Sequence, residues 1–140
     1  MEIWGNYNAA IADCSEAITL RPNSPDAYLN LCQLDAFIGN YSAAIDPCTH
    51  AITLKPGTEA AYLARCQSYD KLANYAPAVT DCTQAITLNP KDADAYNGRG
   101  AAYQGLGNSG QAIADFQKTL TIDPSSQTAQ NAPKQIGAQP

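Results

Sequence analysis

The sequence is poor in the residue types that most often build catalytic and metal sites. Its 140 residues include a single histidine, and no two of its five cysteines stand in a C-x-x-C pair. A zinc site needs several such ligands at short spacing, so we expect neither a metal nor a cofactor. His50 lies two residues from Cys48, which would place the two side chains on different sides of a helix. With no glycine-rich phosphate loop either, we expect that this protein is not an enzyme.

Basic charge and long apolar runs are scarce as well. Eight Lys and Arg residues against 13 Asp and Glu residues give a net charge of −5 and an isoelectric point of about 4.5. This balance argues against a phosphate-binding surface, so we expect no nucleic-acid partner. No apolar stretch approaches the roughly 20 residues that a membrane-spanning helix needs, so we expect no membrane span. A hydrophobic content of 45% still allows a buried core, and the length suits one domain.

A spacing of 34 residues runs through the sequence. Three near-copies read ADCSEAITLRP, DPCTHAITLKP and TDCTQAITLNP. The same spacing joins columns of proline, asparagine, cysteine and tyrosine: Pro22, Pro56, Pro90 and Pro124; Asn6, Asn40, Asn74 and Asn108; Cys14, Cys48 and Cys82; Tyr28, Tyr62 and Tyr96. Self-similarity at a fixed period of this length indicates stacked supersecondary units.

Each period reads as two helices joined by a tight turn. Ser24 can cap a first helix, and Thr58 and Asp92 stand in the same column. Gly39 stands where that helix ends, and Asn40 can cap a second helix that Pro56 ends. Gly5 and Gly107, and the other three asparagines of that column, predict the same turn elsewhere. The period divides the chain into the second helix of a leading half-repeat (1–22), repeat 1 (23–56), repeat 2 (57–90), repeat 3 (91–124) and a polar C-terminal tail (125–140).

Two prolines modify this pattern. Pro47 stands inside the second helix of repeat 1, where it removes a backbone hydrogen bond, and we expect a kink or local opening there. Pro133 falls in the middle of any first helix that Ser126 would cap, so we expect the array to stop or change near that point.

The pattern within each period resembles the tetratricopeptide repeats over about residues 5–126. The matching columns are an early aromatic residue (Tyr28, Tyr62, Tyr96), a small residue (Cys32, Cys66, Gly100), a later aromatic residue (Tyr69, Tyr103), alanines of the second helix (Ala44, Ala78, Ala112; Ala51, Ala85), Phe116 and the prolines. Asp35 departs from the later aromatic column. The resemblance implies an all-α fold, a right-handed α-solenoid of antiparallel helix pairs. It also implies a non-catalytic scaffold or adaptor for protein–protein interaction.

In that family the first helices line the concave side, where partners bind. Helical phase then predicts these partner-binding residues: Asp26, Leu29, Asn30, Gln33, Phe37, Leu63, Gln67, Lys71, Asp94, Asn97 and Gln104. Some family members clamp acidic peptide C-termini with Lys, Arg and Asn in this groove. The matching positions here hold Asp26, Ala60 and Asp94, then Asn30, Ala64 and Gly98, and only Asn30 fits. We therefore expect no carboxylate clamp and a neutral to basic peptide partner, with Leu29, Phe37 and Leu63 as anchors.

The cysteines fall at matched distances from the turns. Cys32 and Cys48 are equidistant from Asn40, so the two should lie level in an antiparallel hairpin, as should Cys66 and Cys82 about the next turn. Two interpretations remain open: small buried apolar side chains, or disulfides Cys32–Cys48 and Cys66–Cys82 that staple each hairpin. Repeat 3 replaces both members together, with Gly100 and Phe116. Pairing between cysteines of neighbouring repeats explains this pattern with more mismatches, because it would leave Cys82 facing Gly100. Pairing within repeats leaves Cys14 unpaired.

The state of the cysteines separates two hypotheses for function. Free thiols would indicate the cytoplasm, whereas disulfides would indicate an extracellular or periplasmic protein. The alternative to an adaptor is a structural, disulfide-stapled array that binds copies of itself. The helix expected over Asn6–Leu20 lacks its first helix, which leaves a stripe of small residues partly uncovered. Head-to-tail contacts at such a face would build an oligomer or fibre.

Overall fold

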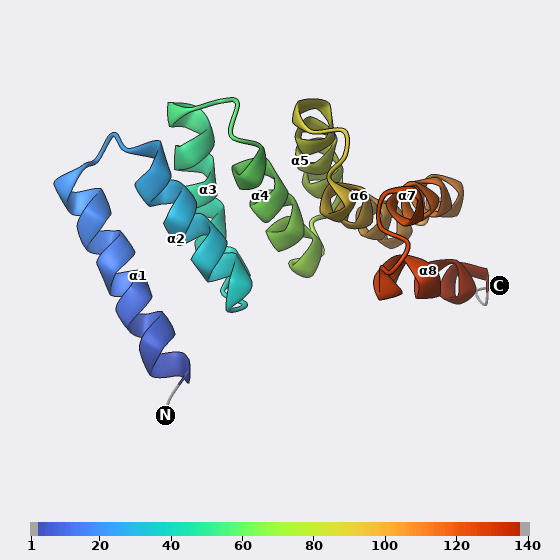
Figure 1. Ribbon diagram of the computed structural model, residues 1–140, viewed down its shortest axis with the longest axis horizontal. Helices are drawn as coiled ribbons and strands as arrows, with labels where there is room; N and C mark the ends of the chain where they lie inside the picture. The colour runs from blue at the N-terminus through green and yellow to red at the C-terminus, as the bar shows by residue number, and fades with distance from the viewer. Residues whose placement is uncertain (1–2, 138–140) are drawn as a thin grey trace.

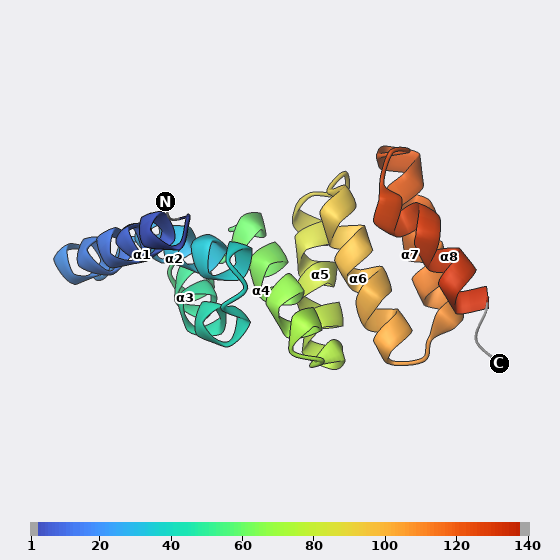
Figure 2. The same cartoon turned by 90° about the horizontal axis from the view of Figure 1, so that it is seen from below.

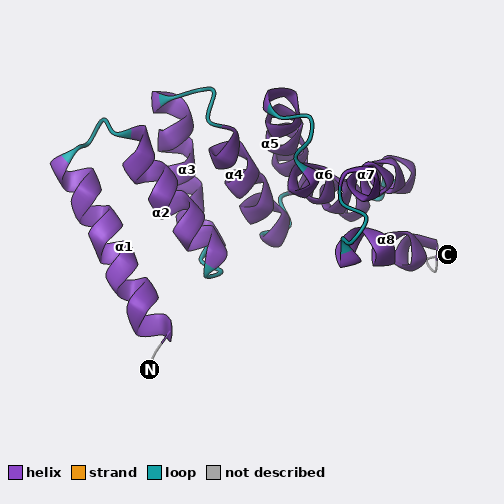
Figure 3. Cartoon of the chain, viewed as in Figure 1, coloured by secondary structure: helices purple, strands orange, loops and turns teal. Residues whose placement is uncertain are grey.

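The computed structural model describes the backbone of residues 3–137 and the side chains of residues 6–132. Over this part the chain is entirely helical, without strands (Figures 1 and 3). The described helices are α1 (Ile3–Leu20), α2 (Pro25–Phe37), α3 (Tyr41–Leu54), α4 (Glu59–Lys71), α5 (Tyr75–Leu88), α6 (Ala93–Gly105), α7 (Ser109–Ile122) and α8 (Gln127–Gly137). The predicted all-α array is therefore confirmed.

The helices follow one another along the long axis of the molecule, from α1 at one end to α8 at the other (Figures 1 and 2). Three hairpins, α2–α3, α4–α5 and α6–α7, form the array, and each hairpin packs against the next. Within the described residues, α2 contacts α4, α4 contacts α6, and α6 contacts α8, whereas α3, α5 and α7 do not contact one another. The array is therefore more tightly packed along its even-numbered helices, which places them on the concave side.

Small residues form the core because the helices pack closely. Three clusters of buried side chains follow one another: Cys32, Ala44, Cys48 and Ala64; Cys66, Ala78, Cys82 and Ala102; Ala112, Phe116, Ala129 and Ala132. The first two clusters each join the two helices of one hairpin to the first helix of the next hairpin. The third joins α7 to α8, with the half-buried Tyr103 of α6 packed against it. A lone hairpin leaves such a face open, so burial requires the next repeat.

The helix starts follow the predicted caps only in part. Ser24 Oγ accepts a hydrogen bond from the Ala27 N–H at 3.3 Å, and Asp92 Oδ1 accepts one from the Asp94 N–H at 3.0 Å. Thr58 occupies the N-cap position of α4 as predicted, but its hydroxyl donates to the Lys55 carbonyl at 2.7 Å and makes no capping bond.

The turns within the hairpins are closed through the backbone of the asparagines. Asn40, Asn74 and Asn108 occupy the N-cap positions of α3, α5 and α7 as predicted, but none makes a side-chain capping bond. Their N–H groups instead donate to carbonyls of the preceding helix, at 2.8 to 2.9 Å. The residue before each asparagine has a positive φ: 90° at Gly39, 83° at Gly107 and 62° at Ala73. Glycine adopts this conformation freely, whereas alanine is strained there.

Three local expectations are corrected by the backbone. Helix α1 runs through Gly5 and Asn6, where we expected a stop and a cap. Helix α3 continues through Pro47 as one 14-residue helix, so the expected opening does not interrupt it, while the kink stays a prediction.

The third correction concerns the segment from residue 125 onward, which we expected to be a polar tail. It forms α8, and this helix continues through Pro133. Ser126 Oγ accepts a bond from the Ala129 N–H at 3.3 Å. Ala129 and Ala132 are buried against Phe116, and this burial offsets the hydrogen bond that a proline removes.

Candidate partner-binding groove

The predicted partner-binding residues all lie on α2, α4 and α6, and each is exposed or half-buried. The structure divides them among three hollows. Five line a hollow between α2 and α4, and four line a second one farther along the concave side: Gln33, Phe37, Leu63, Gln67 and Lys71; Gln67, Lys71, Asp94 and Asn97. Asp26 and Asn30 line a third hollow beside α1. Leu29 and Gln104 line none of these three.

The first hollow, here called the apolar cavity, has a volume of about 370 Å³. Its lining is Gln33, Ala36, Phe37, Tyr41, Ala60, Leu63, Ala64, Gln67 and Lys71. Phe37 is 74% exposed, which is unusual for a large aromatic side chain, although its ring also meets Tyr7 edge-on at 5.8 Å. An exposed ring beside a concave apolar wall is a feature of surfaces that bind an apolar side chain.

The second hollow, here called the acidic cavity, has a volume of about 400 Å³ and lies between α4, α6 and α8. Its lining is Gln67, Asp70, Lys71, Tyr75, Asp94, Asn97, Gly98, Ala101 and Thr128. Asp70 Oδ1 and Asn97 Oδ1 are buried without a hydrogen-bond partner, while Asn97 Nδ2 donates to Ser126 Oγ at 3.2 Å. Two residues of the lining therefore each carry one buried acceptor oxygen that the described residues leave unsatisfied.

Burial also perturbs the acids of this cavity. It raises the pKa of Asp70 to about 7, against a smaller opposing effect of the Lys71 ammonium. Burial, followed by the charges of Asp92 and Asp123, raises the pKa of Asp94. Both carboxyl groups are thus less stable in their charged form than in water, and a nearby cation would stabilise that form.

Asp70 and Tyr75 were missed by our reading of the sequence. The signal for Asp70 was present, because it stands 34 residues before the predicted Gln104. Tyr75 belongs to a second helix, and only its position at the start of α5 brings it to the concave side.

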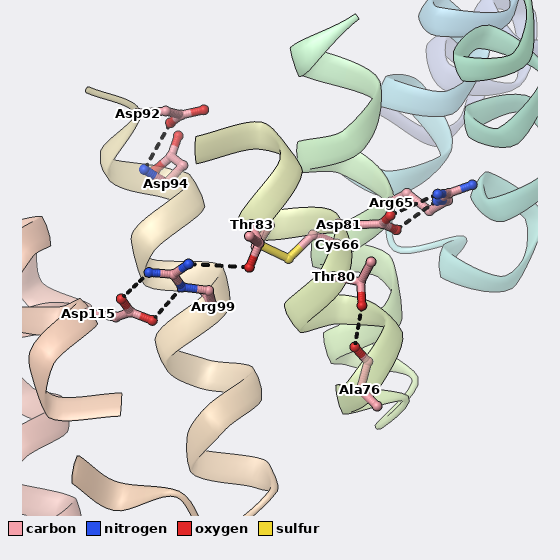
Figure 4. Close-up of a disulfide and its surroundings, with 11 residues drawn as sticks. Arg65, Cys66, Ala76, Thr80, Asp81, Thr83, Asp92, Asp94, Arg99 and Asp115 are labelled. Atoms are coloured by element: carbon pink, nitrogen blue, oxygen red, sulfur yellow. Dashed lines mark hydrogen bonds and ion pairs between the residues drawn. A yellow bond between two sulfur atoms is a disulfide. The ribbon is translucent and has the colours of Figure 1, made fainter. Parts of the chain in front are cut away.

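The cysteines lie beneath the groove, level within each hairpin. Cys32 pairs with Cys48 and Cys66 with Cys82 in disulfides, with Cα–Cα distances of 4.9 and 5.4 Å. Figure 4 shows the disulfide at Cys66. All four are fully buried. A Cβ added at Gly98 would lie 2.8 Å from Cys82 Sγ, so only glycine fits at this point in α6. Cys14 forms no disulfide, and burial, then the charges of Asp13 and Asp35, raise the pKa of its thiol.

Two arginine–aspartate pairs each join the two helices of one hairpin, and the sequence analysis did not identify them (Figure 4). Arg65 and Arg99 each donate two hydrogen bonds to one carboxylate, Asp81 at 2.7 and 2.8 Å and Asp115 at 2.9 Å. Each guanidinium also donates to a threonine of the preceding repeat. The bonds to threonine connect each of these hairpins to the one before it, and the arginine–aspartate pairs lie outside both cavities.

The sequence contains a pattern that could have predicted the arginine pairs. Partners in each pair are 16 residues apart, like the cysteine pairs, and repeat 1 loses both partners together, with Leu31 and Pro47 in their places. Replacement of both partners in the same repeat indicates that the two positions are in contact, as it does for the cysteine pairs.

Neither a metal centre nor a spanning helix stands out. Within the described residues, no three His, Cys, Asp or Glu side chains are grouped closely enough to hold a metal ion. None of the described helices has the length and apolar character needed to cross a membrane.

Comparison with known proteins gives a consistent set of matches. Two sequence models described as tetratricopeptide repeat match residues 60–92 and 93–126. No curated protein matches the sequence. Among solved structures, a crystal structure of MamA is 25% identical with a TM-score of 0.88, and the match covers 97% of this chain and 83% of that one.

Two further similar structures contain bound peptides. The first TPR of Spaghetti (RPAP3), bound to the HSP90 peptide SRMEEVD, is 27% identical with a TM-score of 0.76, over 81% of this chain and 90% of that one. The second TPR domain of human RPAP3, in complex with the HSP70 peptide SGPTIEEVD, is 27% identical with a TM-score of 0.75, over 83% and 100%.

Proposed function

The chain is a tetratricopeptide repeat protein, and we propose that it is a non-catalytic scaffold or adaptor that binds a peptide or protein segment on its concave face. The observation that carries this proposal is the apolar cavity between α2 and α4, with Phe37 74% exposed at its wall. Repeat proteins of this family typically mediate protein–protein interactions, and two similar structures hold peptides.

The charges of the groove favour a partner different from the peptides in those structures. Both peptides end in the acidic sequence EEVD. Here the concave helices present Asp26, Asp70 and Asp94 to the hollows, and Lys71 is the cation that lines the apolar and acidic cavities. Arg21 adds a second cation in the hollow beside α1. A negatively charged peptide end would meet like charges, which disfavours binding. We propose a neutral to basic segment that is anchored by apolar side chains.

The test uses peptides selected from a randomised library on the immobilised chain, with affinities measured by calorimetric titration. Phe37→Ala and Leu63→Ala should each weaken a selected peptide about tenfold or more, because anchors in such cavities contribute about 1.4 kcal/mol or more. Leu88→Ala is the matched control, since Leu88 is 39% exposed on α5, away from both cavities. Equal affinities for all variants would place binding elsewhere and overturn the proposal.

A second candidate function is a structural one, and the two hairpin disulfides favour it. Disulfides persist in oxidising compartments, where a stapled array could assemble with copies of itself. Sedimentation velocity over a range of concentrations separates the two functions. Association that grows with concentration and survives Phe37→Ala supports self-assembly, whereas a monomer at all concentrations removes that candidate.

A further inference from the structure

We propose that the acidic cavity between α4, α6 and α8 is a subsite for one lysine or arginine side chain of the bound segment. This inference rests on the proposed function of the groove and names the chemistry of its partner. The acidic cavity adjoins the apolar cavity, because Gln67 and Lys71 line both. A segment lying across α4 therefore places one side chain in each.

The unsatisfied oxygens determine which group fits. Asp70 Oδ1 and Asn97 Oδ1 are both buried acceptors without a donor. A buried polar atom without a partner carries a free-energy cost, and a buried carboxylate carries a larger one. Ammonium and guanidinium groups supply only donors and a positive charge. An incoming anion or carbonyl group would add a further acceptor and relieve neither oxygen.

The rest of the lining suits a long basic side chain. Gly98 and Ala101 offer a smooth wall on α6 for the aliphatic stem. Tyr75 contributes an aromatic ring, to which cations are attracted. The described residues hold no cluster that would bind a metal ion instead. The occupant is thus an organic cation carried by the partner.

The distance between the two cavities sets the spacing in the partner. Each cavity lies between neighbouring first helices, so their separation is one helix-to-helix step of roughly 10 Å. An extended chain advances about 3.3 Å per residue. The bound segment should therefore carry an apolar residue and a Lys or Arg residue about three positions apart.

The same cavity gives a pH-dependent readout. The titratable or charged groups that line it with Asp70 are Lys71, Tyr75 and Asp94. Because burial raises the pKa of Asp70 to about 7, part of the population is protonated near neutral pH. Binding a cation requires the charged form, so affinity for a basic peptide should rise between about pH 6 and pH 8.

The experiment compares library selections on the wild type, on Asp70→Asn and on Asp46→Asn. Asp46 is an exposed acid on α3 outside both cavities, so its variant makes the same charge change away from the groove. On the wild type and Asp46→Asn, Lys or Arg should be enriched about three positions from an apolar residue. On Asp70→Asn the basic enrichment should disappear while the apolar enrichment remains.

Affinities of one selected peptide and its Lys→Gln or Arg→Gln counterpart complete the test. Asp70→Asn should weaken the basic peptide about tenfold, flatten its pH dependence and change the glutamine peptide less than twofold. Circular dichroism verifies that the variant folds. Apolar enrichment without basic enrichment on the wild type would overturn the subsite and leave the groove function standing. The absence of any enrichment would overturn both.

Discussion

Reduction of the two hairpin disulfides should destabilise the array by a calculable amount. Each bond joins cysteines 16 residues apart in sequence, and the two loops do not overlap. In the chain-entropy model, a closed loop of this length removes about 3 kcal/mol of unfolded-state freedom, so both loops together contribute about 6 kcal/mol. A domain of this size is typically stable by about 5–15 kcal/mol, so reduction should leave a marginal fold.

The assay is urea unfolding followed by far-UV circular dichroism, with and without dithiothreitol. At a slope of about 2 kcal/mol per molar urea, the reductant should lower the midpoint by about 3 M. A Cys14→Ala variant should show the full shift, since Cys14 forms no disulfide. A Cys66→Ala/Cys82→Ala variant keeps one staple, so its response to reductant should be about half as large.

Two results together would contradict a stabilising role of the hairpin disulfides. If the reductant leaves the midpoint unchanged, and the unfolded but unreduced protein reacts with an alkylating reagent at all five cysteines, the native pairs are buried thiols. The cysteines would then act as small apolar side chains, and the argument for an oxidising compartment would fail with them.

Three further predictions concern stability and use the same unfolding assay. Ala73→Gly should stabilise the protein by about 0.5–1 kcal/mol, because glycine adopts the positive φ of 62° without strain. Gly107→Ala should destabilise it by about 1 kcal/mol for the converse reason. If both variants changed the free energy of unfolding in the same direction, backbone strain at these turns would be contradicted. Arg99→Ala should cost about 3 kcal/mol, because it leaves the carboxylate of Asp115 buried and unpaired, and a cost below 1 kcal/mol would contradict a structural pair. Asp70 keeps its proton in the folded chain up to a pKa of about 7, while the unfolded chain loses it near 3.8, so stability should fall as pH rises between these values and then level off. Asp70→Asn should remove part of that fall, and an unchanged profile would show that this carboxyl group does not cause it.

The period of 34 residues was enough to predict the hairpins, their order and which helices line the concave side. It placed Cys32 level with Cys48 because residues equidistant from a turn meet in an antiparallel hairpin. The helix α8 escaped prediction because Pro133 was weighed alone, without the burial of Ala129 and Ala132 against the preceding hairpin. The missing capping bond of Asn40 was not predicted, because a turn with a positive φ at Gly39 is closed through the backbone N–H of Asn40 instead.

The candidate site was less accessible to sequence reasoning than the fold. Helical phase predicted that Phe37 and Leu63, the proposed anchors, lie on the concave side, because the side of a helix on which a residue lies follows from the helical period. The burial of Asp70 depends on how closely α6 and α8 approach α4, and a repeat pattern does not encode that distance. Unsatisfied atoms such as Asn97 Oδ1 are visible only when every neighbouring donor has been placed.

The most direct test of the central claim is a map of backbone amide chemical shifts during titration with a library-selected peptide. We expect the amide shifts to change along α2, α4 and α6, most strongly near Leu63 and Gln67. The shifts of α5 and α7 should stay unchanged apart from residues beside Tyr75. Changes concentrated on α3, α5 and α7 would place the partner on the opposite side and contradict the concave groove as the binding surface.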